Sequence, residues 1–465
     1  MNWKVIAGSL LAATVIGHNL IAQETAPAPG TAIGGIVKPV SEKRVQEVKD
    51  LKFGMFVCWS FSTFANVEWT HGVKSVDWFN PTGYDPEQWV KVAKDAGMGY
   101  ILFLTKHHDG FCLWDTQTTD WKVTKSPLKR DALKELRAAC DKHGIKLALY
   151  FSEGDWTQPN MRNAELKKAQ LKELLTQYGP VEYIWFDHAQ SDGGLSHDET
   201  TAWCKQFQPD CFIGYNHGAA SGDIRLGEMG RPGPTEKKTG IGAGHGEEGY
   251  KGYRLAEFTY PILGGTKQGR WFYTMPEWDG KAIPAETIYN DYLGAVKYGN
   301  VFALDVAPDR AGRIRDIDVE RLATVGKLIR GEIQPVVKKA ALTGKATASG
   351  VWEGKADFDA AKAFDGDFYT RWGAPENAKS GWLEIDLGAE KTIARVLVDE
   401  NHYPRTSEFE IQAKIGGEWK TIATGTAIGA KKEIKFAQPV KAQIFRLNII
   451  KAVGVPSISE FQLFE

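Results

Sequence analysis

The stretch Tyr100-Ile-Leu-Phe-Leu-Thr-Lys106 runs directly into His107-His108-Asp109-Gly110. A short apolar run that ends in polar residues and a glycine is typical of a strand buried on both faces of a parallel sheet. Helical patterns at 86–98 and 130–143 precede and follow it. Similar runs recur along the chain and are predicted to be strands: 54–60, 146–152, 182–187, 212–216, 270–274 and 301–306.

This alternation of strands and helices predicts a parallel sheet, and its length suits a (β/α)8-like barrel over residues 40–335. The active site of such a barrel lies at the carboxyl ends of its strands. Residues 336–465 lack an amphipathic helical pattern and predict an all-β sandwich. Its strands are expected in short alternating segments: 382–386, 392–399, 409–413, 433–436 and 444–449. The expected fold class is therefore an α/β barrel followed by an all-β sandwich.

The composition excludes several classes of protein. Hydrophobic residues make up 43% and charged residues 25% of the chain, unlike disordered or multi-span membrane proteins. The 57 basic and 58 acidic side chains leave a net charge of −1, so no nucleic-acid partner is expected. The 16 Trp residues either fill the core or offer stacking surfaces to sugar rings. The five cysteines, odd in number and without short paired spacings, indicate free thiols.

The amino-terminal segment predicts export. Residues 1–22 contain one basic residue, Lys4, and then an apolar run, which is typical of a secretory signal. An uncleaved anchor is the alternative, although His18 and Asn19 interrupt a run that is short for a span of about 20 residues. Residues 23–39 are predicted to be a flexible spacer. We expect a secreted protein of the bacterial periplasm or cell surface, with no membrane span after signal removal.

Polar residues follow several predicted strands where folding alone does not require them. Asp187 closes one strand, and Arg225 and Glu228 follow the next. Paired carboxylates beside aromatic and imidazole side chains suit the cleavage of a glycosidic bond. Asp187, with His108 and Arg225 as charge partners, fits the carboxylate that stays ionised. The structural alternative is that Asp187 caps a helix or pairs with a neighbouring base. A catalytic metal is not favoured, since no His-x-x-x-His or clustered carboxylate motif occurs.

At these residues the sequence resembles the α-L-fucosidases of glycoside hydrolase family 29, which are retaining enzymes with an irregular (β/α)8-like barrel. The likeness covers about residues 45–332. Short motifs carry it, in family order: Phe53-Gly-Met-Phe56, Lys106-His-His-Asp-Gly-Phe-Cys-Leu-Trp114, Trp185-Phe186-Asp187, Trp271-Phe272-Tyr273 and Pro308-Asp309-Arg310.

The resemblance implies roles for individual residues. Asp187 would be the nucleophile and Glu228 the general acid and base, with Glu257 as the reserve choice for the second role. The side chains expected to hold the sugar are His107, His108, Glu68, Trp69, Tyr150, Arg225 and Trp271. The implied substrate is a fucosylated oligosaccharide or glycoconjugate, and catalysis is expected to need no cofactor.

Two positions depart from the family pattern. The first strand ends Cys58-Trp59-Ser60 where the family has His-Trp-Gly, so a weakly hydrogen-bonding thiol replaces an imidazole. His188 follows Asp187 where the family has glycine, and we expect it to narrow the pocket mouth. Either a neighbour such as His71 substitutes for the missing imidazole, or the preferred sugar is not ordinary terminal fucose. Two alternative functions stay open: a hydrolase of a related L-sugar such as an α-L-galactoside, and a non-catalytic glycan-binding protein on a decayed barrel.

Residues 340–465 resemble the discoidin or coagulation factor 5/8 C-type sandwich, which is often attached to glycosidases as a carbohydrate-binding module. The likeness is carried by Ala363-Phe-Asp365-Gly-Asp367, Thr370-Arg-Trp372 and Ser459-Glu460-Phe. The resemblance implies a structural calcium near four residues with oxygen ligands: Asp365, Asp367, Thr370 and Glu460. A tight Asp-Gly-Asp turn without an ion is the alternative.

Overall fold

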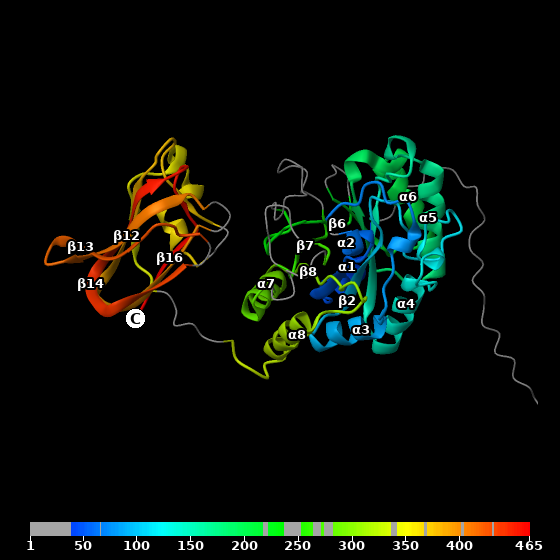
Figure 1. Cartoon of the computed structure of the whole chain (residues 1–465), viewed down its shortest axis with the longest axis horizontal. Coiled ribbons are helices and arrows are strands. Elements are labelled where there is room, and N and C mark those ends of the chain that lie inside the picture. Colours follow the sequence, from blue (N-terminus) through cyan, green and yellow to red (C-terminus); the bar gives the residue numbers. More distant parts are fainter. Residues whose placement is uncertain are drawn as a thin grey trace, which may run out of the picture. The chain divides into compact units, whose positions relative to one another are not determined.

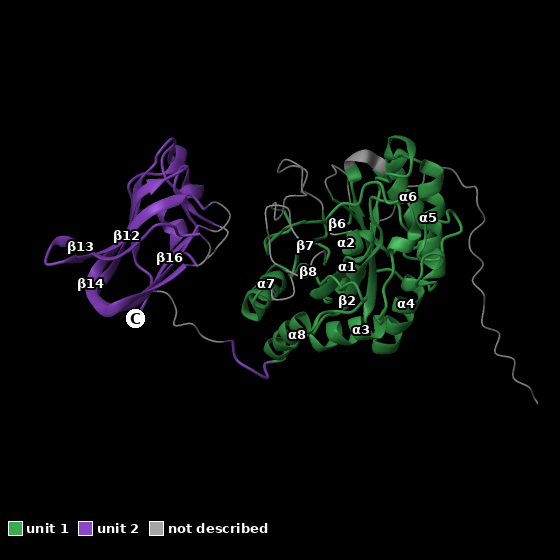
Figure 2. Cartoon of the chain, viewed as in Figure 1, with its two compact units in different colours: residues 1–330 green, residues 331–465 purple. Residues whose placement is uncertain are grey.

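The computed structural model describes residues 39–65, 67–216, 222–236, 253–263, 271–273, 282–335, 342–366, 370–400, 404–429 and 432–465. The chain divides into two compact units, residues 1–330 and 331–465 (Figure 1, Figure 2). The predicted signal and nearly all of the predicted spacer lie outside the described residues. Within the described ranges, none of the helices combines the length and the apolar character that a bilayer span requires.

In the described part of the first unit, eight strands form a nearly closed parallel barrel in the order β5-β4-β3-β2-β1-β8-β7-β6. Its seam therefore lies between β5 and β6. The strands are β1 (Phe53–Val57), β2 (Tyr100–Lys106), β3 (Lys146–Ser152), β4 (Tyr183–Asp187), β5 (Phe212–Tyr215), β6 (Ile224–Arg225), β7 (Leu255–Pro261) and β8 (Val301–Asp305). Most of their residues are buried, because the barrel interior and the surrounding helices cover both faces.

The helices of this unit surround the strands (Figure 1). They are α1 (Glu42–Lys49), α2 (Phe61–Ala65), α3 (Pro86–Asp95), α4 (Ala132–His143), α5 (Ala164–Gln177), α6 (His197–Phe207), α7 (Ala285–Tyr298) and α8 (Asp316–Ile329). Helix α4 shows how local sequence sets these bounds. The side chain of Asp131 caps its first turn, and Gly144 ends it with a φ of 71°, which favours glycine. Leu133 and Leu136 are buried, as the helical spacing predicts.

The barrel confirms the predicted fold class, and all five cysteines are free and buried as expected. One predicted strand is wrong. Residues 271–273, the described part of the strand expected at 270–274, form no strand, and the seventh barrel strand is β7 instead. The aromatic residues Trp271 and Phe272 made this segment of the sequence look like a strand. In the structure their side chains line a cavity, and their backbone does not join the sheet.

The second unit is all-β, as predicted. In its described part, a sheet has the order β13-β12-β14-β11-β16, β9 pairs with β11, and β10 pairs with β15. The strands are β9 (Lys345–Ala348), β10 (Trp372–Gly373), β11 (Gly381–Asp399), β12 (Thr406–Ile415), β13 (Glu418–Gly425), β14 (Lys432–Ala452), β15 (Ser457–Ile458) and β16 (Glu460–Phe464). Strands β11 and β14 each join two predicted segments, because shifts in register let a long strand bend without leaving the sheet.

Candidate active site

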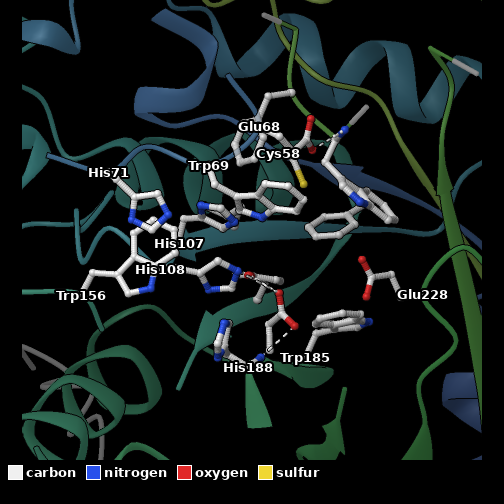
Figure 3. A pocket seen from close by; sticks show the side chains of 16 residues that line it. Cys58, Glu68, Trp69, His71, His107, His108, Trp156, Trp185, His188 and Glu228 are labelled. Atoms are coloured by element: carbon white, nitrogen blue, oxygen red, sulfur yellow. Dashed lines mark hydrogen bonds and ion pairs between the residues drawn. The ribbon is translucent and has the colours of Figure 1, made fainter. Parts of the chain in front are cut away.

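A cavity of about 350 Å³ lies at the carboxyl ends of the barrel strands (Figure 3). Aromatic, imidazole and carboxylate side chains dominate its lining. The lining residues are Phe56, Cys58, Glu68, Trp69, His71, Leu104, His107, His108, Tyr150, Trp156, Trp185, Asp187, His188, Glu228, Trp271 and Phe272. Eight of the ten residues that the sequence assigned to catalysis or sugar binding therefore meet at one cavity.

Asp187 is the last residue of β4, and its carboxylate accepts hydrogen bonds from a tyrosine hydroxyl, a backbone N–H and an asparagine amide. The Tyr150 hydroxyl donates to Oδ2 at 2.6 Å, and the backbone N–H of His188 donates to Oδ1 at 2.8 Å. The amide nitrogen of Asn216 also donates to Oδ1, at 3.0 Å. Burial, together with the charge of Asp187, raises the pKa of Tyr150 well above its usual value, so this tyrosine stays protonated and donates. Donors on a carboxylate favour its charged form.

Glu228 reaches the same cavity from the segment that follows β6. A β-bridge between Glu228 and Thr259 fixes this segment against β7. Oε2 of Glu228 accepts a hydrogen bond of 2.9 Å from the amide nitrogen of Asn216, the same nitrogen that donates to Asp187. The two carboxylates therefore share one hydrogen-bond donor.

Glu257, the reserve choice for the acid, is fully buried on β7 and does not line the cavity. The indole nitrogen of Trp185 donates to its Oε2 at 3.1 Å. Burial raises the pKa of Glu257 to about 8. Trp185, which does line the cavity, contacts this carboxyl group, and of the two candidate acids, Glu228 and Glu257, it is Glu228 that lines the cavity.

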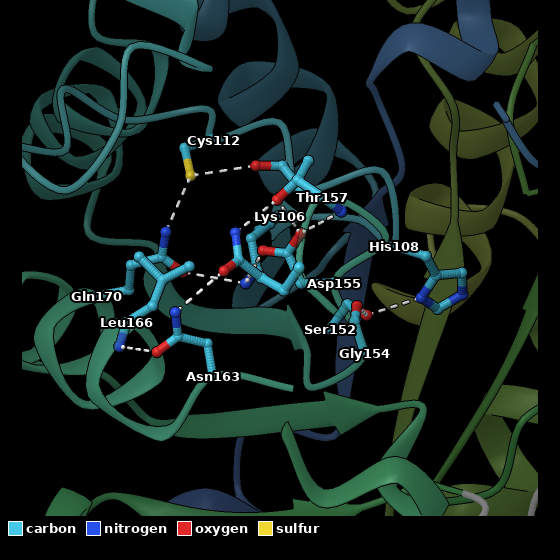
Figure 4. Close-up of polar contacts among 12 residues, drawn as sticks. Lys106, His108, Cys112, Ser152, Gly154, Asp155, Thr157, Asn163, Leu166 and Gln170 are labelled. Carbon is cyan, nitrogen blue, oxygen red and sulfur yellow. Dashed lines mark hydrogen bonds and ion pairs between the residues drawn. The ribbon is translucent and has the colours of Figure 1, made fainter. Parts of the chain in front are cut away.

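The two imidazoles after β2 have different environments. Burial, and then the neighbouring His108, lower the pKa of His107 well below its usual value, so its ring is neutral. Among the described residues, Nδ1 of His107 has no hydrogen-bond partner, which suits contact with a sugar hydroxyl. Nδ1 of His108 lies 2.7 Å from Oγ of Ser152 (Figure 4). Its Nε2 lies 3.7 Å from Oδ2 of Asp187.

Arg225 is the second predicted residue that the structure does not bring to the cavity. Its buried guanidinium donates to the backbone carbonyls of Thr235 at 2.6 Å and Pro234 at 3.1 Å. These bonds direct its guanidinium to the 234–235 segment, and its expected pairing with Asp187 stays a prediction. By contrast, Glu68 lines the cavity and accepts a hydrogen bond of 2.9 Å from the backbone of Trp271.

Sequence reasoning did not assign Asn216 or several cavity-lining residues, among them Leu104 and Trp156, and it only partly anticipated His188. Asn216 follows β5 and is 1% exposed, and a polar residue at the end of a predicted strand is the signal that would have found it. His188 has a φ of 56°, a left-handed conformation that is strained for a histidine and recurs at functional sites. Its ring lines the cavity beside that of His108, at 4.6 Å between ring centres.

Cys58 stands where the family pattern has a histidine, and it lies in the cavity wall. Its backbone N–H donates to Oδ1 of Asp305 at 3.3 Å. Burial, and then Asp305, raise the pKa of the Cys58 thiol well above its usual value, so it remains uncharged. Burial also raises the pKa of Asp305 well above its usual range. This side of the cavity is therefore less polar than an imidazole would make it.

In the second unit, the residues expected to bind calcium are only partly described. Oγ1 of Thr370 donates to both carboxylate oxygens of Asp365, at 2.9 and 2.8 Å, whereas Asp367 lies outside the described residues. Glu460 is fully buried on β16, opposite Asp399 of β11. In the part of the chain that the structure describes, no three His, Cys, Asp or Glu residues group closely enough to hold a metal ion. The observed hydrogen bonds join Asp365 and Thr370, two of the four expected ligands.

Two carboxylates at the carboxyl ends of barrel strands, beside imidazole and aromatic side chains, define a glycoside hydrolase. The α-L-fucosidase family model matches residues 35–332, and the F5/8 type C domain model matches residues 345–461. The chain belongs to the α-L-fucosidase family and carries a C-terminal F5/8 type C domain. Both resemblances read from the sequence are confirmed.

Individual relatives show how far the likeness extends. The chain is 28% identical to alpha-L-fucosidase 1 of Arabidopsis thaliana over 440 residues, 88% of this chain and 84% of that protein. The solved structure of a glycoside hydrolase 29 family member from an unknown rumen bacterium is 25% identical, with a TM-score of 0.54 over 92% of this chain and 77% of that one. A Ruminococcus gnavus GH29 fucosidase in complex with fucose is 22% identical, with a TM-score of 0.51 over 93% of this chain and 97% of that one. The last likeness concerns the fold alone.

Proposed function

We propose that the protein is a retaining exo-α-L-fucosidase that works by double displacement. The observation that carries this proposal is the donor shared by the two carboxylates. Because Oδ1 of Asp187 and Oε2 of Glu228 lie 3.0 and 2.9 Å from one nitrogen, they are within about 6 Å of each other. Carboxyl groups are about 5–5.5 Å apart in retaining glycosidases and about 6.5–9.5 Å apart in inverting ones, which must admit a water between carboxylate and sugar. The spacing supports direct attack by a carboxylate.

In the first step, Asp187 attacks the anomeric carbon while Glu228 protonates the glycosidic oxygen, so that the bond to the aglycone breaks. In the second step, Glu228 removes a proton from water, and the water oxygen displaces Asp187 from the anomeric carbon. The hydrogen bonds from Tyr150 and His188 keep Asp187 ionised before attack. No step uses a cofactor.

The proposed substrate is a terminal α-L-fucosyl residue of an oligosaccharide or glycoconjugate. Membership in the α-L-fucosidase family supports this sugar, and the name of the Arabidopsis relative and the fucose bound to the R. gnavus enzyme agree with it. A neutral sugar needs no charged clamp, and His107 is neutral. Trp69, which is 46% exposed beside Glu68 in the cavity wall, offers a face on which the sugar can stack.

Hydrolysis of aryl glycosides, followed by NMR, tests the sugar and the mechanism together. Incubation of the full chain with 4-nitrophenyl α-L-fucoside is expected to release α-L-fucose as the first product, before mutarotation. Appearance of the β-anomer first would contradict the retaining mechanism. Faster release from the α-L-galactoside would show that this L-sugar is the preferred substrate. If a folded protein released no product from any aryl L- or D-glycoside, the proposed hydrolase activity would be refuted in favour of non-catalytic glycan binding.

Export and calcium binding are separate proposals. We propose that residues 1–22 are removed during secretion to the bacterial periplasm or cell surface, on the strength of their composition. Mass spectrometry of the natural protein is expected to find its amino terminus close to residue 23.

We also propose that Asp365, Thr370, Asp367 and Glu460 hold a structural calcium. Calorimetric titration of chelator-treated protein with Ca²⁺ tests this, and absence of binding heat together with an unchanged melting temperature would refute it.

A further inference from the structure

Asn216 is held rigidly at the barrel seam. It follows β5, its backbone N–H donates to the carbonyl of Phe186 on β4 at 2.7 Å, and its carbonyl accepts from the N–H of Ala189 at 3.3 Å. Its side chain is buried, with 1% of the residue exposed. From this position the amide nitrogen reaches Asp187 on one side and Glu228 on the other. The nitrogen must be the atom that faces these groups, because the amide oxygen would oppose two acceptors.

The Asn216 amide donates one hydrogen to each carboxyl group, and each hydrogen bond determines which oxygen of that group is available for the reaction. The hydrogen bond to Oε2 makes that atom of Glu228 the acceptor, so the acidic proton of Glu228 belongs on Oε1. On Asp187, Asn216 and the backbone N–H of His188 together fill the two lone-pair positions of Oδ1. The attacking lone pair is then on Oδ2, the oxygen that accepts from Tyr150.

We infer that Asn216 is a positioning residue that assigns the proton of Glu228 to Oε1 and the attack to Oδ2 of Asp187. This inference rests on the proposed retaining mechanism. The proposed mechanism requires the negative charge on Asp187 and the proton on Glu228 before attack. When the bond from Oδ2 to the anomeric carbon forms, the proton moves from Oε1 to the leaving oxygen and the charge moves to Glu228. In the second step the oxygen of a water molecule bonds to the anomeric carbon as the bond to Oδ2 breaks, and a proton of that water returns to Oε1. The Asn216 amide donates one hydrogen to each carboxyl group, so it stabilises the negative charge on Asp187 before the first step and on Glu228 after it.

The leaving group separates this role from a merely structural one. A 2,4-dinitrophenolate departs without a proton, whereas a phenolate depends on protonation by Glu228. We expect Asn216→Ala to lower kcat/KM for phenyl α-L-fucoside by about tenfold more than for the 2,4-dinitrophenyl compound, since hydrogen bonds to charged groups are worth roughly 10- to 100-fold. The decrease in kcat/KM that both substrates share measures the loss of the hydrogen bond from Asn216 to Asp187. Because kcat/KM reports the first irreversible step, slow hydrolysis of the intermediate does not obscure the comparison.

Two further variants keep the test decisive. Asn216→Asp has the same size but, when ionised, accepts instead of donating, and it should show the same dependence on the leaving group if Asn216→Ala folds poorly. Asn300→Ala is the matched control, because Asn300 is 2% exposed and its amide donates to the carbonyl of Gly233, away from both carboxylates. It should lower stability without changing the ratio of the two substrates. Equal losses on both substrates in the Asn216 variants would overturn the inference while leaving the proposed function intact, whereas an inactive wild type would refute the function itself.

Discussion

Trp185 donates a hydrogen bond of 3.1 Å from its indole nitrogen to the buried carboxyl group of Glu257, and its ring lines the sugar cavity. Because burial raises the pKa of Glu257 from 4.5 to about 8, the folded protein keeps a proton that the unfolded chain has lost between these two values. Folding stability contributed by this group therefore falls as the pH rises from about 4.5 to about 8, and changes no further above that range.

Glu257→Gln is expected to remove this dependence. The difference in unfolding free energy between variant and wild type should grow in favour of the variant by at most about 1.4 kcal/mol per pH unit across the window, because one proton is involved. Urea denaturation of both proteins at several pH values between 4.5 and 8 measures this difference. Other buried acids titrate in the same way in both proteins, so their contributions cancel when the two unfolding free energies are subtracted. A difference that stays constant with pH would mean that Glu257 is ionised in the folded state.

The same pair of glutamates makes a kinetic prediction. Glu228→Gln should lower kcat/KM for phenyl α-L-fucoside by roughly 10²- to 10⁴-fold, the usual value of general acid catalysis. Glu257→Gln should change it by about tenfold or less, because an amide oxygen can still accept from Trp185. Parallel assays of the two variants decide the assignment, and a larger loss in Glu257→Gln would exchange their roles.

Replacement of the nucleophile should be more damaging. Asp187→Ala removes the atom that bonds to the anomeric carbon, so we expect kcat to fall by roughly a thousandfold or more. The matched substitution Asp198→Ala, on helix α6 outside the cavity, should retain wild-type turnover. Turnover of the aryl fucoside by both purified variants measures the effect, and a nearly active Asp187→Ala protein would show that another group attacks.

Ser152 is expected to fix the orientation of His108. The Ser152 hydroxyl donates to the carbonyl of Gly154 at 2.6 Å, so it accepts from Nδ1 of His108 (Figure 4). Nε2 of His108 is then left on the side of Asp187. Ser152→Ala should lower kcat/KM by about tenfold, as expected for one lost hydrogen bond. Ser126→Ala removes a hydroxyl that is equally buried and donates to the carbonyl of Val123, so it is the control. Equal effects of the two substitutions would show that the Ser152 hydroxyl matters only for stability.

Strand ends explain why much of this site could be predicted from sequence. Asp187 and His107 directly follow or close apolar runs, and the carboxyl ends of barrel strands converge on one face. Glu257 and Arg225 show the limit of this reasoning. Both occur in or beside strands, β7 and β6, that periodicity did not identify, and a strand buried on both faces does not reveal where each side chain points.

Asn216 shows a second limit. Its contacts with Asp187 and Glu228 depend on the lateral pairing of β4 with β5 and on where the chain returns after β6. Strand patterns give the order of elements along the chain, but not the distance between loop atoms of neighbouring strands. The same reason explains why the spacing of Asp365 and Thr370 in the sequence predicted calcium ligands without fixing whether Glu460 reaches them.

A buried ion pair beneath the two histidines makes the last prediction. The ammonium of Lys106, 2% exposed at the end of β2, lies 3.1 Å from Oδ2 of Asp155 and 3.0 Å from Oε1 of Gln170 (Figure 4). Removing one partner of a buried pair leaves the other charge without compensation, which costs about 3–5 kcal/mol. Lys106→Met, which keeps the length of the side chain, should therefore lower the free energy of unfolding of the barrel by this amount. Lys142→Met is the control, because Lys142 pairs with Glu87 at the surface, where water screens the two charges, and it should leave the free energy of unfolding nearly unchanged. Urea denaturation monitored by loss of activity measures both, and a loss below about 1 kcal/mol in Lys106→Met would show that water or another base compensates Asp155.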